Sequence, residues 1–511
     1  MYIHYNTKQT TLPLEISSCL PNDHIVFSIE EFMEQFECPE LDEMFRIHGR
    51  PSYHPKMMLS AILYSYSRGI YSGRKIAELM TDSLSMQYLT GQLIASYRTI
   101  NRFRVLPGME KVIEELFVNF NCYAKMKELI TLDTMFVDGT KIEADANKYT
   151  HVWKKATDKF QTKLQHTLKT DFVDEIQPLI DQAIKDEMEE EITPEHLKEF
   201  AQLLEEELQH LDKDIREQPT KGKDPRKTKR RAVKKVLNKV QNDYLVRLEK
   251  YNHYQSIFDG RNSFSKTDTD ATFMRMKDDH MKNGQLKPGY NLQIGTENQF
   301  VLHFDVFPNP TDTLTLLPFL DSCHLDIKTL VADAGYGSEE NLLALNDQGI
   351  EHYIKYNTFD KEQTRKYQKS SKNMDNWTYD QEQDCYTHPE GFVYTFSHIE
   401  HRKTTTGFLQ EIKVYKTDQP DQAPQKGLYI NDRYQILKNE AKEALLSAQG
   451  QQIFAQRKID VEPVFGQIKA CLGYTRCNLR GKRKVKIDMG LVLMANNLKK
   501  LNKHEGKRLI K

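Results

Sequence analysis

The chain has 511 residues, of which 39% are hydrophobic and 28% are charged, and its formal net charge is −1 at pH 7. This composition is typical of a globular protein of about three domains, and no apolar stretch is long enough to cross a bilayer. The seven cysteines are scattered without zinc-site spacing, and the N-terminus lacks the pattern of a signal peptide. We therefore expect a cytoplasmic protein with free thiols and no membrane partner.

The near-zero net charge hides two basic segments. Residues 221–239 contain ten Lys and Arg and one Asp, and residues 457–511 contain fifteen Lys and Arg against four Asp and Glu. Residues 186–207, by contrast, are acidic. Such asymmetry favours a protein that binds nucleic acid. Solvated helix faces are the alternative, above all for residues 221–239.

Residues 1–110 have the pattern of a helical module. Pro55 suits the first turn of a helix, apolar residues then recur at helical spacing, and Gly69 ends the run. Its last element, Tyr97–Arg104, interleaves arginines with aromatic residues. We predict a helix-turn-helix-like DNA-binding domain, with a plain helical bundle as the alternative. The predicted DNA-contacting residues are Arg98, Arg102 and Arg104.

A strand pattern begins at residue 131. Its apolar run stops at Asp138-Gly139, and continuous apolar runs are typical of strands buried on both faces. Residues 150–259 are then charged and helical in pattern, which predicts an inserted helical hairpin with polar outer faces.

Strand patterns resume at residues 289–296 and 300–307, and a further buried strand ends at Asp333. Residues 360–430 alternate polar and apolar residues, which predicts a small β-rich insertion. The expected fold is α/β: a mixed central sheet flanked by helices, with an N-terminal all-helical domain and two insertions. The catalytic core would combine residues 128–150, 260–360 and 431–505.

Three carboxylates stand where a metal site would need them. Asp138 and Asp333 each follow an apolar strand, and Glu462 begins a late helix. Ligands of α/β sheets bind beyond the carboxyl ends of strands. Phosphodiester cleavage uses two divalent ions about 4 Å apart, and Mg²⁺ prefers a few carboxylates. We predict that the three side chains converge as catalytic residues and metal ligands. Turn-forming aspartates and a surface glutamate are the alternative.

Lys469 follows Glu462 by seven residues, which is two helical turns, so both are expected on one helix face. A lysine in that position can bind a DNA phosphate beside the metal ions.

Several motifs occur in a known order. They are Asp138-Gly-Thr-Lys141, Val331–Gly337, Asp460–Lys469 and Leu479-Arg480-Gly481. They resemble the first-Asp, second-Asp and Glu-helix motifs of bacterial insertion-sequence DDE transposases. Residues 53–104 resemble the InsH-type N-terminal domain of such proteins. The resemblance spans nearly the whole chain.

One motif departs from the family pattern. Related transposases carry Tyr-x2-Arg-x3-Glu-x6-Lys on the Glu helix. Strict spacing puts Lys458 where Arg belongs, whereas Phe454 and Arg457 fit in type but lie one residue too far upstream. We therefore assign neither Arg457 nor Lys458. Pro463 predicts a helix start or a kink.

The resemblance implies an RNase H-like core that cleaves the ends of a mobile element and joins the freed 3′-hydroxyl to target DNA. It implies a two-metal Mg²⁺ site in which Mn²⁺ can substitute, with Lys469 and Arg480 on DNA. Double-stranded DNA would be the partner of a homodimer or larger assembly in a bacterial cytoplasm. Two alternatives stay open: an RNase H-like structure-specific nuclease or resolvase, and a catalytically inactive transposase-derived DNA-binding protein.

Overall fold

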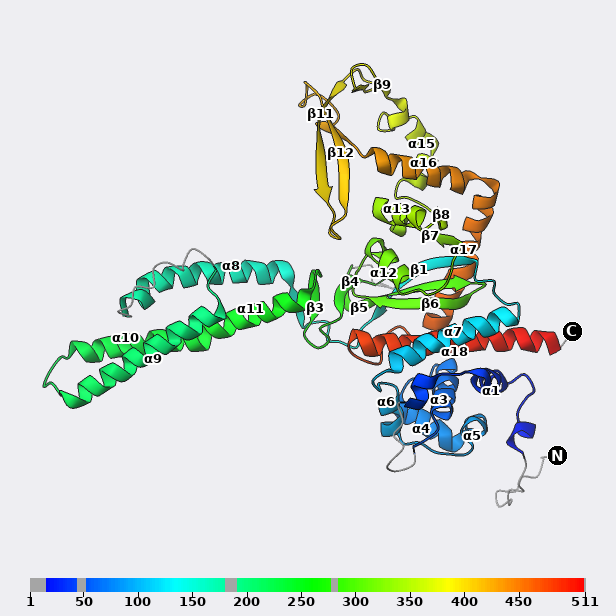
Figure 1. Ribbon diagram of the computed structural model, residues 1–511, viewed down its shortest axis with the longest axis horizontal. Helices are drawn as coiled ribbons and strands as arrows, with labels where there is room; N and C mark the ends of the chain where they lie inside the picture. Colours follow the sequence, from blue (N-terminus) through cyan, green and yellow to red (C-terminus); the bar gives the residue numbers. More distant parts are fainter. Residues whose placement is uncertain (1–14, 44–51, 180–190, 277–283, 510–511) are drawn as a thin grey trace, which may run out of the picture. The chain divides into compact units, whose positions relative to one another are not determined.

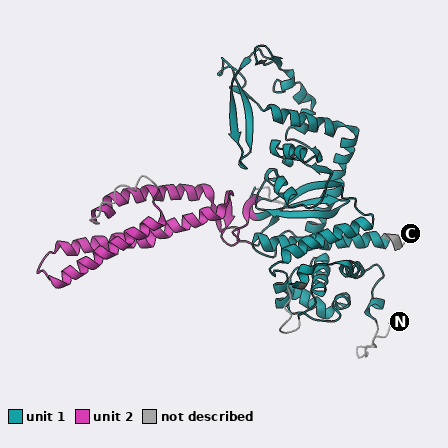
Figure 2. Cartoon of the chain, in the orientation of Figure 1, with its two compact units in different colours: residues 1–145, 275–285, 289–511 teal, residues 146–274, 286–288 magenta. Residues whose placement is uncertain are grey.

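The computed structural model describes residues 15–43, 52–179, 191–276 and 284–509 (Figure 1). The chain divides into two compact units (Figure 2). Unit 1 comprises residues 1–145, 275–285 and 289–511, and unit 2 comprises residues 146–274 and 286–288.

A mixed sheet forms the centre of unit 1. On one side, β1 (Thr134–Glu143) pairs antiparallel with β5 (Leu286–Glu297), which pairs antiparallel with β6 (Phe300–Phe307). On the other side, β1 pairs parallel with β7 (Thr329–Ala332), and β7 pairs parallel with β8 (Glu351–Ile354). The resulting order, β6-β5-β1-β7-β8, is RNase H-like, as the sequence predicted.

The apolar strand residues make this sheet the middle of the core. All four residues of β7 are buried, and Met135 and Val137 of β1 pack with them. Helices α12 (Leu316–Asp321) and α13 (Glu339–Asp347) add Phe319, Leu342 and Leu345 to the same cluster. Strands buried on both faces are what the continuous apolar runs predicted.

The predicted end of the first strand at Asp138 is wrong. β1 continues to Glu143, because its pairing with β5 extends from Phe136 to Glu143. Only the parallel pairing with β7 stops earlier, at the pair Phe136–Val331. Asp138 therefore lies inside β1, two residues beyond Phe136, the last residue of β1 that pairs with β7.

The N-terminal part of unit 1 is helical. The helix predicted at Pro55 is confirmed as α3 (Pro55–Ser67), and Gly69 after it has a φ of 72°. Other elements are η1 (Ile16–Cys19), α1 (Ile25–Gln35), α2 (Pro39–Glu43), α4 (Gly73–Asp82), α5 (Leu84–Thr90), α6 (Tyr97–Phe103) and α7 (Met109–Met126). The last helix, α18 (Lys482–Leu509), contacts α1, α3, α7 and β6 and so ties these helices to the sheet.

Two helices of unit 1 precede α18. They are α16 (Asp432–Leu446) and α17 (Ala448–Gly466), which contacts β1, β7 and β8. The π-helical turn η8 (Gln467–Cys471) follows α17 directly. Short elements are η5 (Asp312–Leu314), η6 (Ala334–Tyr336), α14 (Phe359–Glu362), α15 (Arg365–Gln368) and η7 (Met374–Asn376).

The β-rich segment is an antiparallel five-stranded sheet in the order β13-β12-β11-β10-β9. Its strands are β9 (Thr378–Asp380), β10 (Cys385–Thr387), β11 (Val393–Lys403), β12 (Leu409–Lys416) and β13 (Gly427–Ile430).

Helix α17 continues through Pro463, so a helix start there is wrong, and the predicted kink stays a prediction. Proline lacks the N–H that would bond the carbonyl of Ile459. The side chain of Gln299 replaces it, because its Nε2 donates to Ile459 O at 3.0 Å. Gln299 belongs to the two-residue β5–β6 turn, where Asn298 and Gln299 have φ values of 51° and 63°. Positive φ at both positions is typical of a tight hairpin turn.

Unit 2 is mostly helical. Its helices are α8 (Lys154–Asp171), η2 (Phe172–Ile176), η3 (Gln177–Leu179), α9 (Pro194–Glu217), α10 (Pro225–Lys239), η4 (Val240–Tyr244) and α11 (Leu245–Phe258). Pro194 and Pro225 are the first residues of their helices, a position that proline favours. The short strands are β2 (His151–Trp153), paired with β3 (Ser263–Ser265), and β4 (Thr272–Arg275) at the sequence boundary between the units.

Candidate catalytic site

Two of the predicted catalytic residues, Asp138 in β1 and Asp333 just after β7, occupy neighbouring positions in the middle of the central sheet. The parallel register pairs Phe136 of β1 with Val331 of β7. Two residues further along each chain come Asp138 and Asp333, so adjacent strands carry them to neighbouring positions. Both lie near the buried Tyr336, whose pKa is raised by its burial and then by the charges of Asp312, Asp138 and Asp333.

Asp138 is buried and held by two donors. Its Oδ1 accepts a hydrogen bond from the Gly139 backbone N–H at 2.8 Å. Its Oδ2 lies 3.2 Å from Nη1 of Arg457, and both side chains are 11% exposed. Arg457 belongs to α17, so this ion pair joins the helix to β1. The sequence left Arg457 unassigned, and its spacing from Phe454 was the one signal that pointed to it.

Asp333 begins the turn after β7. Its Oδ1 accepts from the Gly335 backbone N–H at 2.8 Å and caps the short helix η6. A Cβ at Gly335 would lie 2.9 Å from that oxygen. Gly335 therefore allows the turn to fold tightly around the carboxylate.

A third carboxylate, Asp312, lies beside this pair and is not among the catalytic residues predicted from the sequence. Its Oδ1 accepts from Asn291 Nδ2 at 2.7 Å and from Gln293 Nε2 at 2.9 Å. Tyr336 donates in turn to Gln293 Oε1. The signal was Asn291 and Gln293, two polar residues on one face of β5 that alternate with the apolar Tyr290, Leu292 and Ile294.

Glu462 has a different environment. It is exposed on α17, five residues after Arg457, which corresponds to about 140° around a regular helix. Lys469 is partly buried in the π-helical turn η8, so the spacing of a regular α-helix, on which its predicted alignment with Glu462 rests, does not apply over this turn. Within the described ranges, no three His, Cys, Asp or Glu side chains are grouped so that they could hold a metal ion.

Two family models match the chain. Residues 14–106 match a model described as Transposase domain (DUF772), and residues 261–498 match the Transposase DDE domain. The chain belongs to the DDE transposases. Asp333 and Glu462 lie within the matched DDE segment, and Asp138 precedes it. Searches of curated proteins and of solved structures give no match.

The DDE domain implies a phosphoryl-transfer enzyme that binds DNA, and DDE transposases generally use divalent metal ions. The donor type fits such an ion, because Asp138 and Asp333 offer carboxylate oxygens from neighbouring strands. Among the helices that the structure describes, none is both long and apolar enough to cross a membrane.

The predicted DNA-contacting arginines of the transposase separate into two groups. Arg98 and Arg102 are exposed on α6, and Arg98 lies over the ring of Tyr97 with 5.8 Å to its centroid. Arg74 of α4 lies 5.2 Å from the centroid of the same ring. These exposed cations form a surface that can reach DNA.

The prediction that Arg104 contacts DNA is wrong. It is 5% exposed and donates at 2.8 Å both to Tyr66 Oη and to the Tyr71 carbonyl. Its guanidinium lies 4.0 Å from the buried Asp488 of α18. This buried network ties α6 to α3 and α18, so Arg104 has a structural role instead of a DNA contact.

Arg480 is 57% exposed, and its Nε pairs with Asp145 at 2.9 Å. Arg476 pairs with the other oxygen of the same carboxylate at 3.0 Å. Arg480 is thus near the end of β1, and DNA would have to compete with Asp145 for it.

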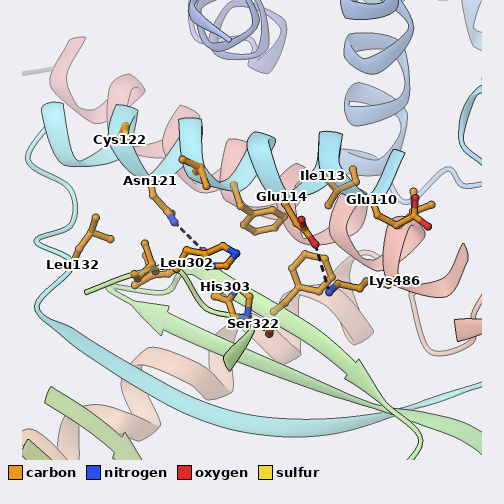
Figure 3. Close-up of a pocket in the computed structure, with 16 residues that line it drawn as sticks. Glu110, Ile113, Glu114, Asn121, Cys122, Leu132, Leu302, His303, Ser322 and Lys486 are labelled. Atoms are coloured by element: carbon orange, nitrogen blue, oxygen red, sulfur yellow. Dashed lines mark hydrogen bonds and ion pairs between the residues drawn. The ribbon is translucent and has the colours of Figure 1, made fainter. Parts of the chain in front are cut away.

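A cavity of about 190 Å³ lies between α7, β6 and α18 and is distinct from the acidic pair (Figure 3). Burial lowers the pKa of its His303 to about 4, which keeps that imidazole neutral. Its walls are mainly apolar: Ile113, Phe117, Val118, Leu302 and Phe304. Such walls do not suit a polyanion, so we assign the cavity no part in DNA binding.

Proposed function

We propose that this transposase cleaves DNA at the ends of its mobile element and joins the freed 3′-hydroxyl to target DNA. The observation that carries the proposal is the neighbouring placement of Asp138 and Asp333 in the central sheet of a chain that belongs to the DDE transposases. A resolvase-like nuclease would share the acidic pair, but the match of residues 14–106 to a transposase domain favours transposition.

In this proposal Asp138, Asp333 and Glu462 hold two Mg²⁺ ions, for which Mn²⁺ can substitute. When bound, the ions activate the attacking oxygen and stabilise the leaving oxygen. Asp138 and Asp333 are positioned by their strands. Glu462 is exposed on α17, the helix that also carries Arg457, and its carboxylate would complete the site.

Other residues support the acidic pair. Arg457 neutralises part of the charge of Asp138 in its buried position. Asp312 holds Asn291 and Gln293 of β5 and thereby fixes the floor of the site, which Tyr336 completes. These side chains set the positions of the carboxylates without entering the reaction.

The DNA partner is proposed to be double-stranded, with the protein acting as a homodimer or larger assembly. Arg98 and Arg102 would contact the element's end sequence, since exposed arginines can reach base edges. Lys469 and Arg480 would contact phosphates closer to the acidic pair.

The test is cleavage of linear DNA that carries the sequences flanking the gene, with Mg²⁺ and with EDTA. Wild type should release a 3′-hydroxyl end at the element boundary and join it to a second DNA. Asp138→Asn, Asp333→Asn and Glu462→Gln should each reduce cleavage by about 10³-fold or more, because a lost metal ligand removes several kcal/mol of transition-state stabilisation.

Asp347→Asn, at an exposed acid in α13, is the matched control and should cleave as wild type does. Near wild-type cleavage by any of the three variants removes that residue from the site. Cleavage of branched DNA without dependence on the flanks would instead identify a resolvase, and DNA binding without any cleavage would identify an inactive derivative.

A further inference from the structure

A basic pocket lies where α17, α18 and the β5–β6 turn meet. It has a volume of about 450 Å³, and three lysines of α18 line it: Lys499, Lys500 and Lys503. The remaining wall consists of Gln299, Pro463, Val464, Gln467, Asn496 and His504. Pro463 directly follows Glu462 in α17, so the pocket borders the exposed helix face on which Glu462 lies.

The positive charge of this pocket is poorly compensated. Neither Lys499 nor Lys503 forms an ion pair with any residue that the structure describes. Asp460, whose charge acts on Lys500, is 1% exposed, and its Oδ1 accepts from the Gln299 backbone N–H at 2.8 Å. Lys500 donates only to the Asn298 carbonyl, a neutral group, and lies over the Phe300 ring at 4.9 Å from its centroid.

Lys500 is partly buried, and its burial lowers its pKa to about 8. The charge of Asp460 acts in the opposite direction, and the charge of Lys503 has a smaller lowering effect. An anion placed between the lysines would favour their charged forms.

The pocket continues along α18. A second pocket of about 310 Å³ shares Lys499 and is lined on its far side by Arg68 and His24 of the N-terminal helices. Arg68 is exposed and is held in place by Tyr64, because Nη1 donates to its Oη at 3.0 Å. Lysines of α18 and Arg68 therefore follow one strip from the edge of α17 to the end of α3.

We infer that this strip binds the backbone phosphates of duplex DNA and guides one strand across α18 towards the face of α17 that carries Glu462. The ligand follows from charge: closely spaced lysines, exposed at Lys503 and partly buried at Lys499 and Lys500, that form no ion pair with the described residues match a line of phosphates. The inference rests on the proposed function, because it assigns the DNA path of the same enzyme.

The test compares two sets of three lysines in the full-length protein. One variant carries Lys499→Gln, Lys500→Gln and Lys503→Gln. The matched control carries Lys227→Gln, Lys234→Gln and Lys235→Gln on α10, where the lysines are exposed and form no ion pair within the described chain. Fluorescence anisotropy measures binding to a duplex with the gene's flanks and to a scrambled duplex across a salt series.

The pocket variant should bind both duplexes more weakly by the same factor, roughly 10- to 100-fold near 0.15 M salt. Its salt slope should fall by about 2.7, since each phosphate contact contributes about 0.9. The control should stay within about threefold of wild type. The corresponding triple Lys→Arg variant should restore binding, and Lys503→Gln alone, at an exposed position, should lower the slope by about 0.9 even if the triple variant fails to fold.

A folded pocket variant that binds as wild type does, or a control that loses as much affinity, overturns the inference. The proposed function fails in a different way. A wild-type protein that binds neither duplex, or that binds but never cleaves, rejects the transposase activity itself.

Discussion

The two basic segments of this chain have different surroundings. In unit 2, the cations of α10 that face its neighbours are matched by acids: Lys229 pairs with Glu207 and Arg230 with Asp212, both on α9. Lys239 pairs with Asp171 and Glu175. In unit 1, the lysines at the end of α18 line an open pocket instead. Similar charge density thus serves helix packing in one region and, in our proposal, DNA in the other.

The difference follows from where the acids of each region are used. Helices α9 and α10 lie side by side, so Glu207 and Asp212 of α9 can pair with Lys229 and Arg230 of α10, whereas the exposed lysines of α10 form no ion pair with the described residues. Residues 457–511 contain only four acids. Asp460 accepts from Gln299, Asp488 accepts from Tyr66 and Tyr474, Glu505 pairs with Lys127, and Glu462 is exposed. A basic run therefore favours a DNA surface when most of its neighbouring acids are engaged elsewhere.

The largest effect expected within this comparison is a loss of cleavage on substitution of Arg457. This cation belongs to residues 457–511 and faces the acidic pair Asp138 and Asp333. Arg457→Ala should reduce cleavage about 10- to 100-fold, because loss of a partner that orients a metal-binding carboxylate has this cost. It should also raise the Mg²⁺ concentration needed for half-maximal cleavage. DNA affinity should change little, since the side chain is only 11% exposed. The measurement is a Mg²⁺ titration of cleavage alongside DNA binding.

Lys458→Ala is the matched control, because Lys458 is the exposed neighbour of Arg457 and contacts no acid of the site. Arg457→Lys should recover part of the activity through its charge. If Lys458→Ala loses more cleavage than Arg457→Ala, the strict motif spacing was correct and the pair Arg457–Asp138 does not position the site.

A smaller effect is expected from pH, which should change the DNA affinity through the protonation of Lys500. The groups around it are Asp460 from α17, Lys503 and His504 from α18, and the ring of Phe300. In free protein its pKa is about 8. A bound phosphate favours the protonated form, so affinity is greatest below pH 8 and falls as the pH rises through that value.

DNA affinity should therefore drop by about tenfold between pH 7 and pH 9 for wild type, as expected for one proton taken up near pH 8. Lys500→Arg keeps its charge throughout this range and should remove most of the drop. Anisotropy at constant ionic strength checks both. An equal pH dependence in the two proteins would mean that Lys500 does not contact DNA.

The sequence predicted the central sheet well because long buried strands leave an unambiguous apolar pattern. Asp138 and Asp333 followed from the same pattern. The environments of single side chains did not, since they depend on contacts between distant segments. Arg104 resembles a DNA-binding arginine until its contact with Tyr66 is seen, and Pro463 is tolerated in α17 only because Gln299 bonds the orphaned carbonyl.

The smallest expected effect is a change in thermal stability, which should distinguish the ion-paired Lys239 of unit 2 from the exposed Lys503 of α18. Lys239 lies 2.6 Å from Asp171 and 3.0 Å from Glu175, and its side chain is 34% exposed. Pairs this exposed are screened by solvent and contribute about 0.2–1 kcal/mol each, so Lys239→Gln should destabilise unit 2 by about 1 kcal/mol. Its melting temperature should fall by roughly 2–4 °C, and less in high salt.

Lys503→Gln is the same chemical change at an exposed lysine of α18 and should leave the melting temperature unchanged. The effects on DNA should be reversed: Lys503→Gln weakens binding, whereas Lys239→Gln does not. Thermal unfolding followed by circular dichroism, together with anisotropy, measures both properties for both proteins. If Lys239→Gln also weakens DNA binding, or if Lys503→Gln also lowers the melting temperature, the two regions do not divide packing and DNA binding between them, because one lysine would then serve both.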